Sequence, residues 1–552
     1  MEYYNKHLNL DYCNSHNYIE GDVECNDDIY YVNNVIVENN RAIHGDTAIV
    51  DENNNIVSIK HHNNSLIVGI LHLNGNTKYG YTKKNVPYYK FSPISNKFPT
   101  FIVPSKDKSK SASYCVIRFN KWETKNKNPI GMVEYFIGKV GSIENEINML
   151  LYKSNIYPKR NKITYNNLDS LEEKIIDYNT FSIDPVGCKD IDDALHYEEN
   201  NGYFTIGVHI ANVARYIEDC KTNYYSSIYL ENKQLNMLDD KHSFNNCSLG
   251  NGEKKRALSL ILKFKGYVLE DYYFKETIVK NKALSYQDAE NMICKIKSGS
   301  VYNLWKFTCK LKNDDKISAT SLVEHYMLLY NNLLASTLYK KNKNTILRTH
   351  KMNHELIDFD ITNDKLKLFL KRINQNGAKY EINPENTKHE DLNLDYYTHG
   401  TSPIRRYVDI INQKNMINLL EDNELICLSQ NEIDSINLFQ KNLRKFYNYY
   451  KKLQLIFKIE NSNIYNAFVV GINKYYINIY IPDIEITHSF RIISPKLLNV
   501  NSCESSNNSI TVNNIEIKLY QQIKIKLTPL KYEENFNRKI NIELLDPVIE
   551  LI

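Results

Sequence analysis

Hydrophobic and polar residues alternate over short distances in the first third of the chain, up to about residue 160. The alternating and apolar runs lie at 28–37, 41–50, 66–71, 101–104, 114–119 and 135–141. Alternation with a period of two predicts half-buried strands, and the Asn, Gly and Asp residues between the runs predict tight turns. Short strands of this kind build small barrels or sandwiches. We therefore predict two small barrels, over residues 1–62 and 63–165.

The pattern changes to longer segments between residues 166 and 458, which we assign to one large domain. Apolar residues recur every three or four positions over 437–458, and this spacing predicts an amphipathic helix. A second predicted helix, 320–341, is apolar nearly all round, so we expect it to be buried and its Glu324 to need a partner or a function. Short alternating runs return over 459–552, which predicts a third small barrel.

Composition is ordinary for a soluble globular protein, with 42% hydrophobic and 24% charged residues among 552. Basic residues number 69 and acidic residues 65, so any surface that binds nucleic acid must be local. The ten cysteines include no Cys-x-x-Cys pair, which favours reduced thiols in an intracellular protein. No apolar run approaches 18 residues and the first residues do not resemble a signal peptide, so no membrane segment is expected.

Four aspartates lie within ten residues: Asp184, Asp190, Asp192 and Asp193. Two carboxylates about 4 Å apart repel by roughly 4 kcal/mol at an effective dielectric constant near 20. Four of them in one pocket would oppose folding unless protons or cations neutralised them. Oxygen-preferring divalent cations such as Mg²⁺ are the simplest neutralising partners at neutral pH. The cluster therefore predicts a metal site.

A solvated acidic loop is the alternative explanation of this cluster. Cys188 and Ile191 are poor residues for a solvent-facing loop, and apolar, strand-like sequence flanks the cluster on both sides. The pair Asn201-Gly202 predicts a hairpin directly after the second flanking strand. Calcium loops of the EF-hand type are excluded, because the twelfth position counted from Asp184 is Leu195 instead of a glutamate. These features favour carboxylates held at the mouth of a sheet.

A second motif, Thr401-Ser402-Pro-Ile-Arg405-Arg406-Tyr407, stands far along the chain. A Ser-Pro turn that leads through two arginines into a helix offers forked donors, backbone N–H groups and a helix dipole, which together suit a phosphate. The alternative is a structural arginine pair that neutralises the aspartates. Carboxylates that bridge two metal ions, with an arginine on the substrate phosphate, are the arrangement used for two-metal phosphodiester hydrolysis.

A basic stretch with an interleaved tryptophan lies in the second predicted barrel and includes Arg118 and Trp122. Basic side chains and aromatic rings on a small barrel suit single-stranded nucleic acid, and a solvated lysine-rich loop is the alternative. The sequence therefore predicts a metal-dependent phosphodiesterase with accessory barrels that bind single strands. Proteases and glycosidases with paired carboxylates are disfavoured, because no Asp-Thr-Gly or Asp-Ser-Gly element is present.

Several motifs together resemble the ribonuclease II / ribonuclease R (RNB) family, and most closely its eukaryotic, exosome-associated branch. The motifs are Asp184-x5-Asp190-x-Asp192-Asp193-Ala, Gly207-Val-His-Ile-Ala, Ser226-Ser-Ile-Tyr229-Leu and Thr401-Ser-Pro-Ile-Arg-Arg-Tyr. Segments 40–46 and 129–141 resemble the two N-terminal cold-shock barrels, and 544–547 resembles the end of the C-terminal barrel. The resemblance implies an α+β multidomain fold. In it, an RNB catalytic domain at 166–458, a mixed sheet with surrounding helices, is flanked by three OB-fold barrels.

The resemblance also implies an activity, namely processive hydrolysis of RNA from a free 3′ end to nucleoside 5′-monophosphates. The four aspartates would hold two Mg²⁺ ions, with Mn²⁺ able to substitute, and Asp192 would lie nearest the catalytic water. Arg405 and Arg406 would contact the terminal phosphates, beside Ser402. Tyr229 and Tyr286 would stack on the 3′-terminal nucleotides, with ordinary core aromatics as the alternative for both.

The sequence departs from the family pattern at several positions, which leaves the rate and the grip on substrate open, and the rival prediction is an RNB-fold RNA-binding protein with weak or no catalysis. The departures are Asn212, Lys255, Gly400 and the pair Gln413-Lys414, where the family usually has Asp, Arg, an aromatic residue and His-Arg. All four aspartates are kept, so the enzyme is preferred. Because the chain starts at the first barrel, we expect a stand-alone, monomeric exonuclease without the N-terminal endonuclease domain. It is predicted to lack a stable exosome association and any membrane contact, and to reside in the cytoplasm, with the nucleus as the alternative.

Overall fold

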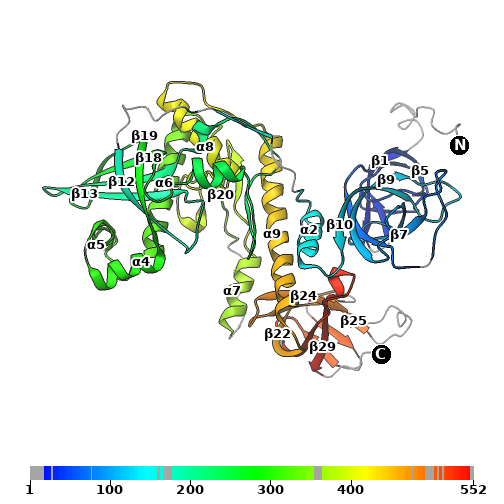
Figure 1. The fold of residues 1–552 in the computed structure, drawn as a ribbon. Helices are drawn as coiled ribbons and strands as arrows, with labels where there is room; N and C mark the ends of the chain where they lie inside the picture. The colour runs from blue at the N-terminus through cyan, green and yellow to red at the C-terminus, as the bar shows by residue number, and fades with distance from the viewer. Residues whose placement is uncertain are drawn as a thin grey trace. The chain divides into compact units, whose positions relative to one another are not determined.

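The computed structural model describes residues 18–547 apart from 27–28, 76, 158–161, 167, 169–176, 223, 354–362, 474–475, 492–502, 506–508 and 513–514. The chain divides into two compact units (Figure 1). The first comprises 1–157, 360–368 and 442–552, and the second comprises 158–359 and 369–441. Among the helices in the described part of the chain, none has the length and apolar character needed to cross a membrane.

The first unit opens with a five-stranded sheet of order β3-β2-β1-β4-β5. Its strands are β1 Ile19–Asn26, β2 Ile29–Val32, β3 Val35–Val37, β4 Thr47–Val50 and β5 Ile56–His61. Val23 and Cys25 are buried whereas Glu24 between them is exposed, as strand alternation requires. The alternation in the sequence is thereby confirmed as sheet.

A closed five-stranded barrel follows, in the order β10-β8-β7-β6-β9. Its elements are β6 Ile67–His72, β7 Tyr88–Pro93, β8 Phe101–Pro104, β9 Ala112–Lys121, β10 Ile130–Lys139 and the helix α2 Ile143–Lys153. Phe91 and Phe101 fill the interior edge to face, with ring centroids 6.2 Å apart. The second predicted barrel is therefore present and closes on itself.

The C-terminal part of the first unit is a five-stranded sheet of order β24-β23-β22-β28-β29, with a three-stranded sheet β25-β26-β27. Its elements are β22 Asn463–Ile472, β23 Tyr476–Ile481, β24 Ile486–Arg491, β25 Cys503–Ser505, β26 Ser509–Val512, β27 Ile515–Lys518, β28 Gln522–Pro529, η5 Phe536–Arg538 and β29 Ile540–Asp546. The predicted return to short strands after residue 459 is confirmed.

A buried ion pair joins this C-terminal part to the second barrel. Nζ of Lys539 lies 3.1 Å from Oε1 of Glu146 on α2, and both side chains are 0% exposed. The Tyr114 hydroxyl donates to both Glu146 oxygens at 3.1 Å, and the Gly141 backbone N–H donates to Oε1 at 3.0 Å. Lys539 also donates to the Lys531 carbonyl oxygen at 3.0 Å. Additional hydrogen bonds of this kind are what a buried charge pair needs.

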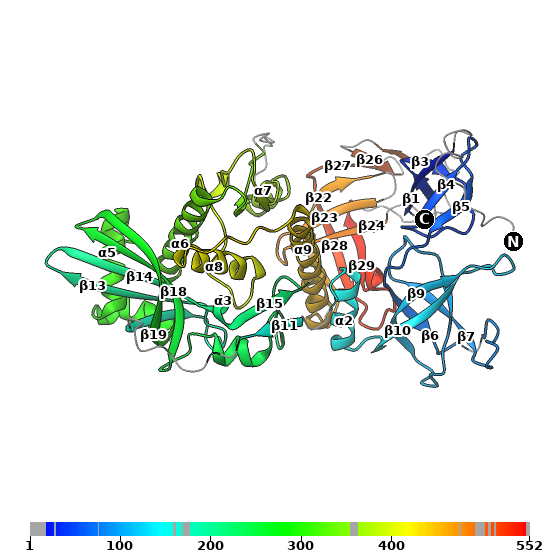
Figure 2. The same cartoon turned by 90° about the horizontal axis from the view of Figure 1, so that it is seen from above.

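The second unit is built on a closed barrel of five strands in the order β12-β13-β14-β18-β19 (Figure 2). The strands are β12 Asp177–Asp184, β13 Asp193–Asn200, β14 Tyr203–Ala211, β18 Lys254–Lys265 and β19 Val268–Ser285. β12 and β19 are parallel and the other neighbours antiparallel, so the predicted mixed sheet is correct. Asn201 and Gly202 form the predicted hairpin turn with φ of +49° and +81°.

Helices cover the barrel of the second unit. Phe307 of α5 and Tyr326 of α6 belong to the same apolar core as Leu260 of β18. The elements are α3 Val213–Tyr216, α4 Tyr286–Asn291, η2 Met292–Ile296, α5 Ser300–Lys312, α6 Ala319–Lys341, η3 Glu390–Leu392 and α8 Tyr407–Leu420. Short strands accompany them: β11 Lys162–Tyr165, β15 Ile217–Lys221, β16 Ile228–Tyr229, β17 Gln234–Leu235, β20 Ile346–Thr349 and β21 Lys379–Ile382, with the π-helix η1 His242–Asn246.

Two predicted helices are confirmed, one of them with a correction. The helix expected over 320–341 is α6, but Glu324 lies on an exposed face, so the expectation that it needs a buried partner was wrong. The helix expected over 437–458 is α9, Gln430–Lys458, which begins seven residues earlier. Residues of α9 and of α7, Asp364–Ile373, belong to both units. The division between the units falls within α9, after residue 441, and the domain boundary expected after residue 458 stays a prediction.

Candidate active site

The four aspartates of the acidic cluster gather at one edge of the barrel in the second unit. β12 ends at Asp184 and β13 begins at Asp193, and the loop between the two strands carries Asp190 and Asp192. Because β12 and β13 are adjacent and antiparallel, the end of one and the start of the other lie at the same edge of the barrel. The structure therefore places the cluster at the mouth of a sheet, as the flanking sequence predicted.

The loop that carries Asp190 and Asp192 is anchored through Ile191, which is buried between them. The Ile191 backbone N–H donates to the Ser248 hydroxyl at 3.0 Å, and its carbonyl accepts from the Leu249 N–H at 2.9 Å. Asp190 is 9% exposed and Asp192 5% exposed. A freely solvated acidic loop is therefore excluded.

Burial makes the charged forms of these carboxylates unfavourable. Desolvation, together with the neighbouring charge of Asp190, raises the pKa of Asp184 to about 6. Desolvation and the charge of Asp184 raise the pKa of Asp193 to about 7. The pKa of Asp192 is raised well above its ordinary value, again chiefly by desolvation. A protein site that keeps several such carboxylates close together gains stability from a bound cation.

Asp190 accepts two hydrogen bonds from side chains of the short hairpin β16–β17. The Tyr229 hydroxyl donates to its Oδ2 at 2.5 Å, and the Gln234 amide donates to the same oxygen at 2.8 Å. Burial and the bond to Asp190 raise the pKa of Tyr229, so its hydroxyl keeps its proton. Gln234 was missed in the sequence, because a lone glutamine four residues beyond a motif carries no signal of its own.

Tyr286 stands at the first position of α4, immediately after β19. β19 runs parallel to β12 with Ser285 opposite Asp184, so Tyr286 follows directly at the edge where the aspartates gather. Its pKa is raised by burial and by the charges of Asp193 and Asp184. Both predicted tyrosines are therefore brought to the acidic cluster, although their stacking on nucleotides stays a prediction.

Arg405 reaches the acidic cluster from the Ser-Pro turn. Its Nε lies 3.3 Å from Oδ2 of Asp192, and the Ile404 backbone N–H donates to Oδ1 of Asp192 at 2.9 Å. The Ser402 hydroxyl accepts from the Arg405 guanidinium at 2.8 Å, which fixes the direction of the arginine. The Arg405 side chain is 43% exposed and can therefore meet a substrate.

Arg406 points into the protein, unlike its neighbour Arg405. Its guanidinium donates to Oδ1 of the fully buried Asp409 at 2.9 Å, and the same oxygen accepts from the Ser402 backbone N–H at 2.7 Å. The two arginines thus have different partners in the structure. Arg406 and Asp409 together hold the turn that presents Arg405.

The donor set suits a hard divalent cation in its chemistry. All four groups are carboxylates, and Oδ2 of Asp184 is a buried acceptor that bonds to no described residue. Among the described residues, however, no three Asp, Glu, His or Cys side chains converge closely enough to coordinate an ion directly. Asp190 and Asp192 instead face Tyr229 and Arg405. Residues of the right type are therefore present, with two of them engaged by protein donors.

Two departures from the family pattern have structural causes. The Asn212 amide donates to Oε1 of Glu276 at 2.7 Å, whereas an aspartate at this position would bring two carboxylates together. A Cβ atom at Gly400 would lie 2.2 Å from Cδ2 of Leu334 on α6, so no larger side chain fits there without a shift. Asn212 and Gly400 each fit their own surroundings, and neither departure removes an aspartate of the acidic cluster.

Two further departures also make definite contacts. Gln413 is fully buried, donates to the Ala211 carbonyl oxygen at 2.9 Å and accepts from the Ala214 N–H at 3.3 Å. Lys255 donates to the Asn245 carbonyl oxygen at 2.5 Å. Gln413 thereby attaches α8 to Ala211 at the end of β14, and the Ala211 N–H in turn bonds the Asp192 carbonyl.

Arg118 and Trp122, which we predicted to bind RNA, belong to the first unit. Arg118 donates to the Asn64 carbonyl oxygen at 2.5 Å and pairs with Glu134 at 3.2 Å. Trp122 packs on the core of the second barrel and lines a pocket of about 550 Å³ together with Arg41, Lys125, Lys127 and polar neighbours. Trp122 therefore lies at a basic pocket, whereas Arg118 is held by protein partners.

Comparisons with known proteins identify the domains of the chain. Residues 167–305 and 303–422 match the RNB domain, and residues 88–155 match the Dis3-like cold-shock domain 2. The chain contains an RNB domain. The RNB match contains all four aspartates, Arg405 and both tyrosines. The predicted resemblance is thereby confirmed.

Relatives of this RNB protein include bacterial and eukaryotic ribonucleases. Ribonuclease R 2 of Lactococcus lactis is 24% identical over 388 residues, which are 53% of this chain and 58% of the relative. The exosome complex exonuclease RRP44 of Mus musculus is 24% identical over 415 residues, which are 58% of this chain and 43% of that protein. The match thus spans about half the length of these curated relatives.

Solved structures share the fold over nearly the whole RNB protein. Mycoplasma genitalium RNase R, solved in complex with ribose methylated single-stranded RNA, has a TM-score of 0.71 at 15% identity, covering 96% of this chain and 100% of that one. Yeast Ssd1, described as a pseudonuclease, has a TM-score of 0.66 at 14% identity and 97% coverage of each chain. At these identities the likeness concerns the fold alone. A nuclease and a pseudonuclease share this fold.

Proposed function

We propose that the chain is a metal-dependent 3′-to-5′ exoribonuclease that hydrolyses single-stranded RNA processively to nucleoside 5′-monophosphates. The observation that carries the proposal is the gathering of Asp184, Asp190, Asp192 and Asp193 with Arg405 at one barrel edge. Burial raises the pKa values of Asp184, Asp192 and Asp193, and such perturbed groups are typical of functional sites. The ribonuclease relatives support the same activity.

Two Mg²⁺ ions are the cofactor we propose, with Mn²⁺ able to substitute. Asp184, Asp190, Asp192 and Asp193 would hold them, and when bound the ions supply a water of lowered pKa and a partner for the leaving oxygen. Arg405 would orient the phosphate from its exposed position. The Tyr229 hydroxyl, by donating to Asp190, fixes the direction of that carboxylate.

The second candidate is an RNA-binding protein of the same fold with weak or no hydrolysis. One observation favours it, namely that among the described residues no three metal-ligating side chains converge. The salt bridge from Arg405 to Asp192 is the contact that would have to open for both groups to serve the reaction. The likeness to yeast Ssd1 extends to the fold alone and does not decide between the two candidates.

A labelled RNA with a single-stranded 3′ end tests the proposal. Wild type with Mg²⁺ should release nucleoside 5′-monophosphates from the 3′ end alone, and EDTA should stop the reaction. Asp192→Asn should lower the rate by more than about 100-fold while RNA binding is kept, because the loss concerns charge stabilisation and not the RNA path. Asp271→Asn, an exposed aspartate on β19, is the matched control and should behave as wild type.

Two results would contradict the exonuclease. Internal cuts in the RNA would contradict an enzyme that hydrolyses from the 3′ end alone. RNA binding without hydrolysis in wild type, with Mg²⁺ or with Mn²⁺, would leave the second candidate. The predictions of a monomer in the cytoplasm without stable exosome association stay predictions, and cell fractionation with gel filtration would test them.

A further inference from the structure

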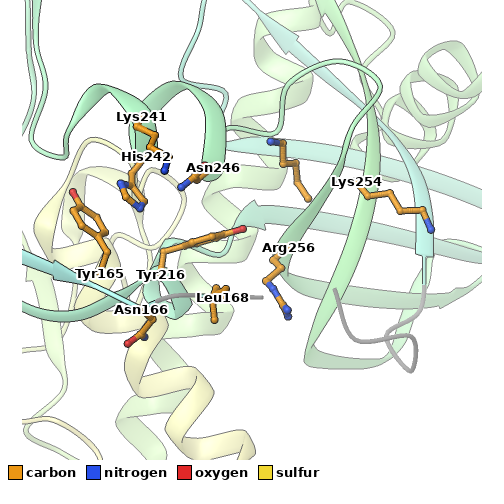
Figure 3. A pocket seen from close by; sticks show the side chains of 10 residues that line it. Tyr165, Asn166, Leu168, Tyr216, Lys241, His242, Asn246, Lys254 and Arg256 are labelled. Carbon is orange, nitrogen blue, oxygen red and sulfur yellow. The ribbon is translucent and has the colours of Figure 1, made fainter. Parts of the chain in front are cut away.

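A pocket of about 560 Å³ opens in the second unit (Figure 3). It lies close in the chain to Ser248 and Leu249, which bond Ile191 in the aspartate loop. It lies between the strand β11, the end of α3, the π-helix η1 and the start of β18. The described residues that line it are Tyr165, Asn166, Leu168, Tyr216, Lys241, His242, Asn246, Lys254, Lys255 and Arg256. Its volume falls within the range of about 300–1,000 Å³ that is typical of sites for small ligands.

The pocket has a local excess of basic residues. Five of its lining residues are Lys, Arg or His, and none of the lining residues described is acidic. The whole chain has almost as many acidic as basic residues, 65 against 69, so the excess in the pocket is local. Two acidic residues outside the lining offset part of this excess: Glu253 lies 2.8 Å from Nζ of Lys255, and Asp239 lies 2.9 Å from Nδ1 of His242. A concave surface with such an excess attracts an anion.

Aromatic rings form part of the wall. Tyr165 stacks on His242 with ring centroids 3.5 Å apart and an angle of 4° between the planes. The ring of Tyr216 meets His242 edge to face, and Figure 3 shows it in the middle of the pocket, between Lys241 and Arg256. Asp239 holds the His242 ring from behind, 2.9 Å from Nδ1. Cations and aromatic faces in one pocket are the combination that binds a phosphate together with a base or sugar.

The pocket is attached to the candidate active site by two short connections. The chain leaves η1 into Ser248 and Leu249, which bond Ile191 between two of the aspartates. On the other side the Arg256 carbonyl accepts from the Asn212 N–H, next to the Ala211 N–H that bonds the Asp192 carbonyl. The lining residues themselves include none of the four aspartates. The pocket is therefore a neighbour of the active site and distinct from it.

We propose that this pocket is a second site for a phosphorylated nucleotide group. The phosphate would lie among the cations and the base or sugar against the ring of Tyr216. The group has two sources, a nucleotide within an RNA strand or a free nucleoside 5′-monophosphate. The inference deepens the proposed function, because RNA is its substrate and the monophosphate its product. Binding at this pocket is nevertheless measurable without hydrolysis.

Binding in EDTA tests the pocket separately from catalysis. The probes are AMP and a single-stranded oligoadenylate of about ten nucleotides, each titrated against the full chain at several salt concentrations. The test variant is Lys241→Gln/Arg256→Gln. The matched control is Lys263→Gln/Lys265→Gln, which removes the same charge from exposed positions at the far end of β18. Melting temperatures check that all variants fold. If the double variant does not fold, Lys241→Gln alone, at an exposed position, replaces it.

We expect the double test variant to bind RNA about tenfold more weakly than the control. The slope of log affinity against log salt should fall in magnitude by about 1.4, or by about 0.7 for Lys241→Gln alone, since each phosphate contact on a single strand contributes about 0.7. Loss of AMP binding as well identifies the free nucleotide as an occupant, and an effect on RNA alone identifies a strand segment. Affinities and slopes equal to those of the control for both probes would overturn the proposal. Hydrolysis by wild type is assayed separately, so failure of the pocket and failure of the exonuclease are distinguishable.

Discussion

Replacing Lys539 by methionine should loosen the contact between the second barrel and the C-terminal part of the first unit. The substitution leaves Glu146 fully buried without its counter-charge. Removing one partner of a buried pair costs about 3–5 kcal/mol, because the remaining charge is uncompensated. The Tyr114 hydroxyl and the Gly141 N–H still bond the carboxylate, so we expect the lower end, about 3 kcal/mol. That is roughly a 150-fold change in a local opening equilibrium.

Hydrogen exchange read by mass spectrometry is the suitable measurement, because a single unfolding free energy is not well defined for a chain of several domains. Peptides from α2 and from 536–546 should exchange roughly 150-fold faster in Lys539→Met, corresponding to the 3 kcal/mol above. Lys524→Met, at an exposed position of β28, is the control and should leave their exchange unchanged.

A double variant provides the result that would refute this reasoning. In Glu146→Met/Lys539→Met both charges of this pair are gone, so protection should recover relative to Lys539→Met. A double variant that is less protected than Lys539→Met, or a single variant that changes exchange less than about fivefold, would show that desolvation does not dominate here. The exposed pair of Lys60 and Glu20 is shorter, at 2.8 Å, yet should contribute only about 0–1 kcal/mol.

Three further substitutions follow from the site. Tyr229→Phe removes one donor to Asp190 and should lower the hydrolysis rate by about tenfold with RNA affinity unchanged, measured by single-turnover kinetics; equal rates would contradict a positioning role. Gly400→Ala places a methyl group against α6 and should cost about 1–3 kcal/mol, seen as a lower melting temperature of the second unit. Asn212→Asp should destabilise this unit by about 1–3 kcal/mol at neutral pH, and the added substitution Glu276→Gln should restore it, because one carboxylate then remains. Absence of that rescue would exclude repulsion as the cause.

The parts that the sequence predicted well are those specified by neighbouring residues. Alternation indicated the strands, and Asn201-Gly202 fixed a hairpin whose register the structure reproduces. Apolar sequence around the aspartates indicated a sheet edge, because the apolar Ile191 between Asp190 and Asp192 favours burial of the loop. The RNB domain was also predictable, since its motifs are short and specific.

The parts that could not be predicted depend on residues far apart in the chain. Nothing in the motif of two arginines tells that Arg405 faces Asp192 whereas Arg406 faces Asp409. Gln234 is joined to the site only by the fold of β16 and β17. Glu324 was expected to be buried because its helix is apolar on most sides, but tertiary packing leaves one face of α6 in solvent.

The separation between the two halves of the acidic site has a consequence for synthesis. The Ile404 N–H and the Asp192 carboxylate that it bonds are 212 positions apart. At about 5–20 residues per second, a ribosome takes roughly 10–40 s to add the second half after the first. Over that interval the aspartates leave the ribosome without their guanidinium partner. A nascent chain therefore acquires the complete candidate site only late in translation, after most of the second unit has been made.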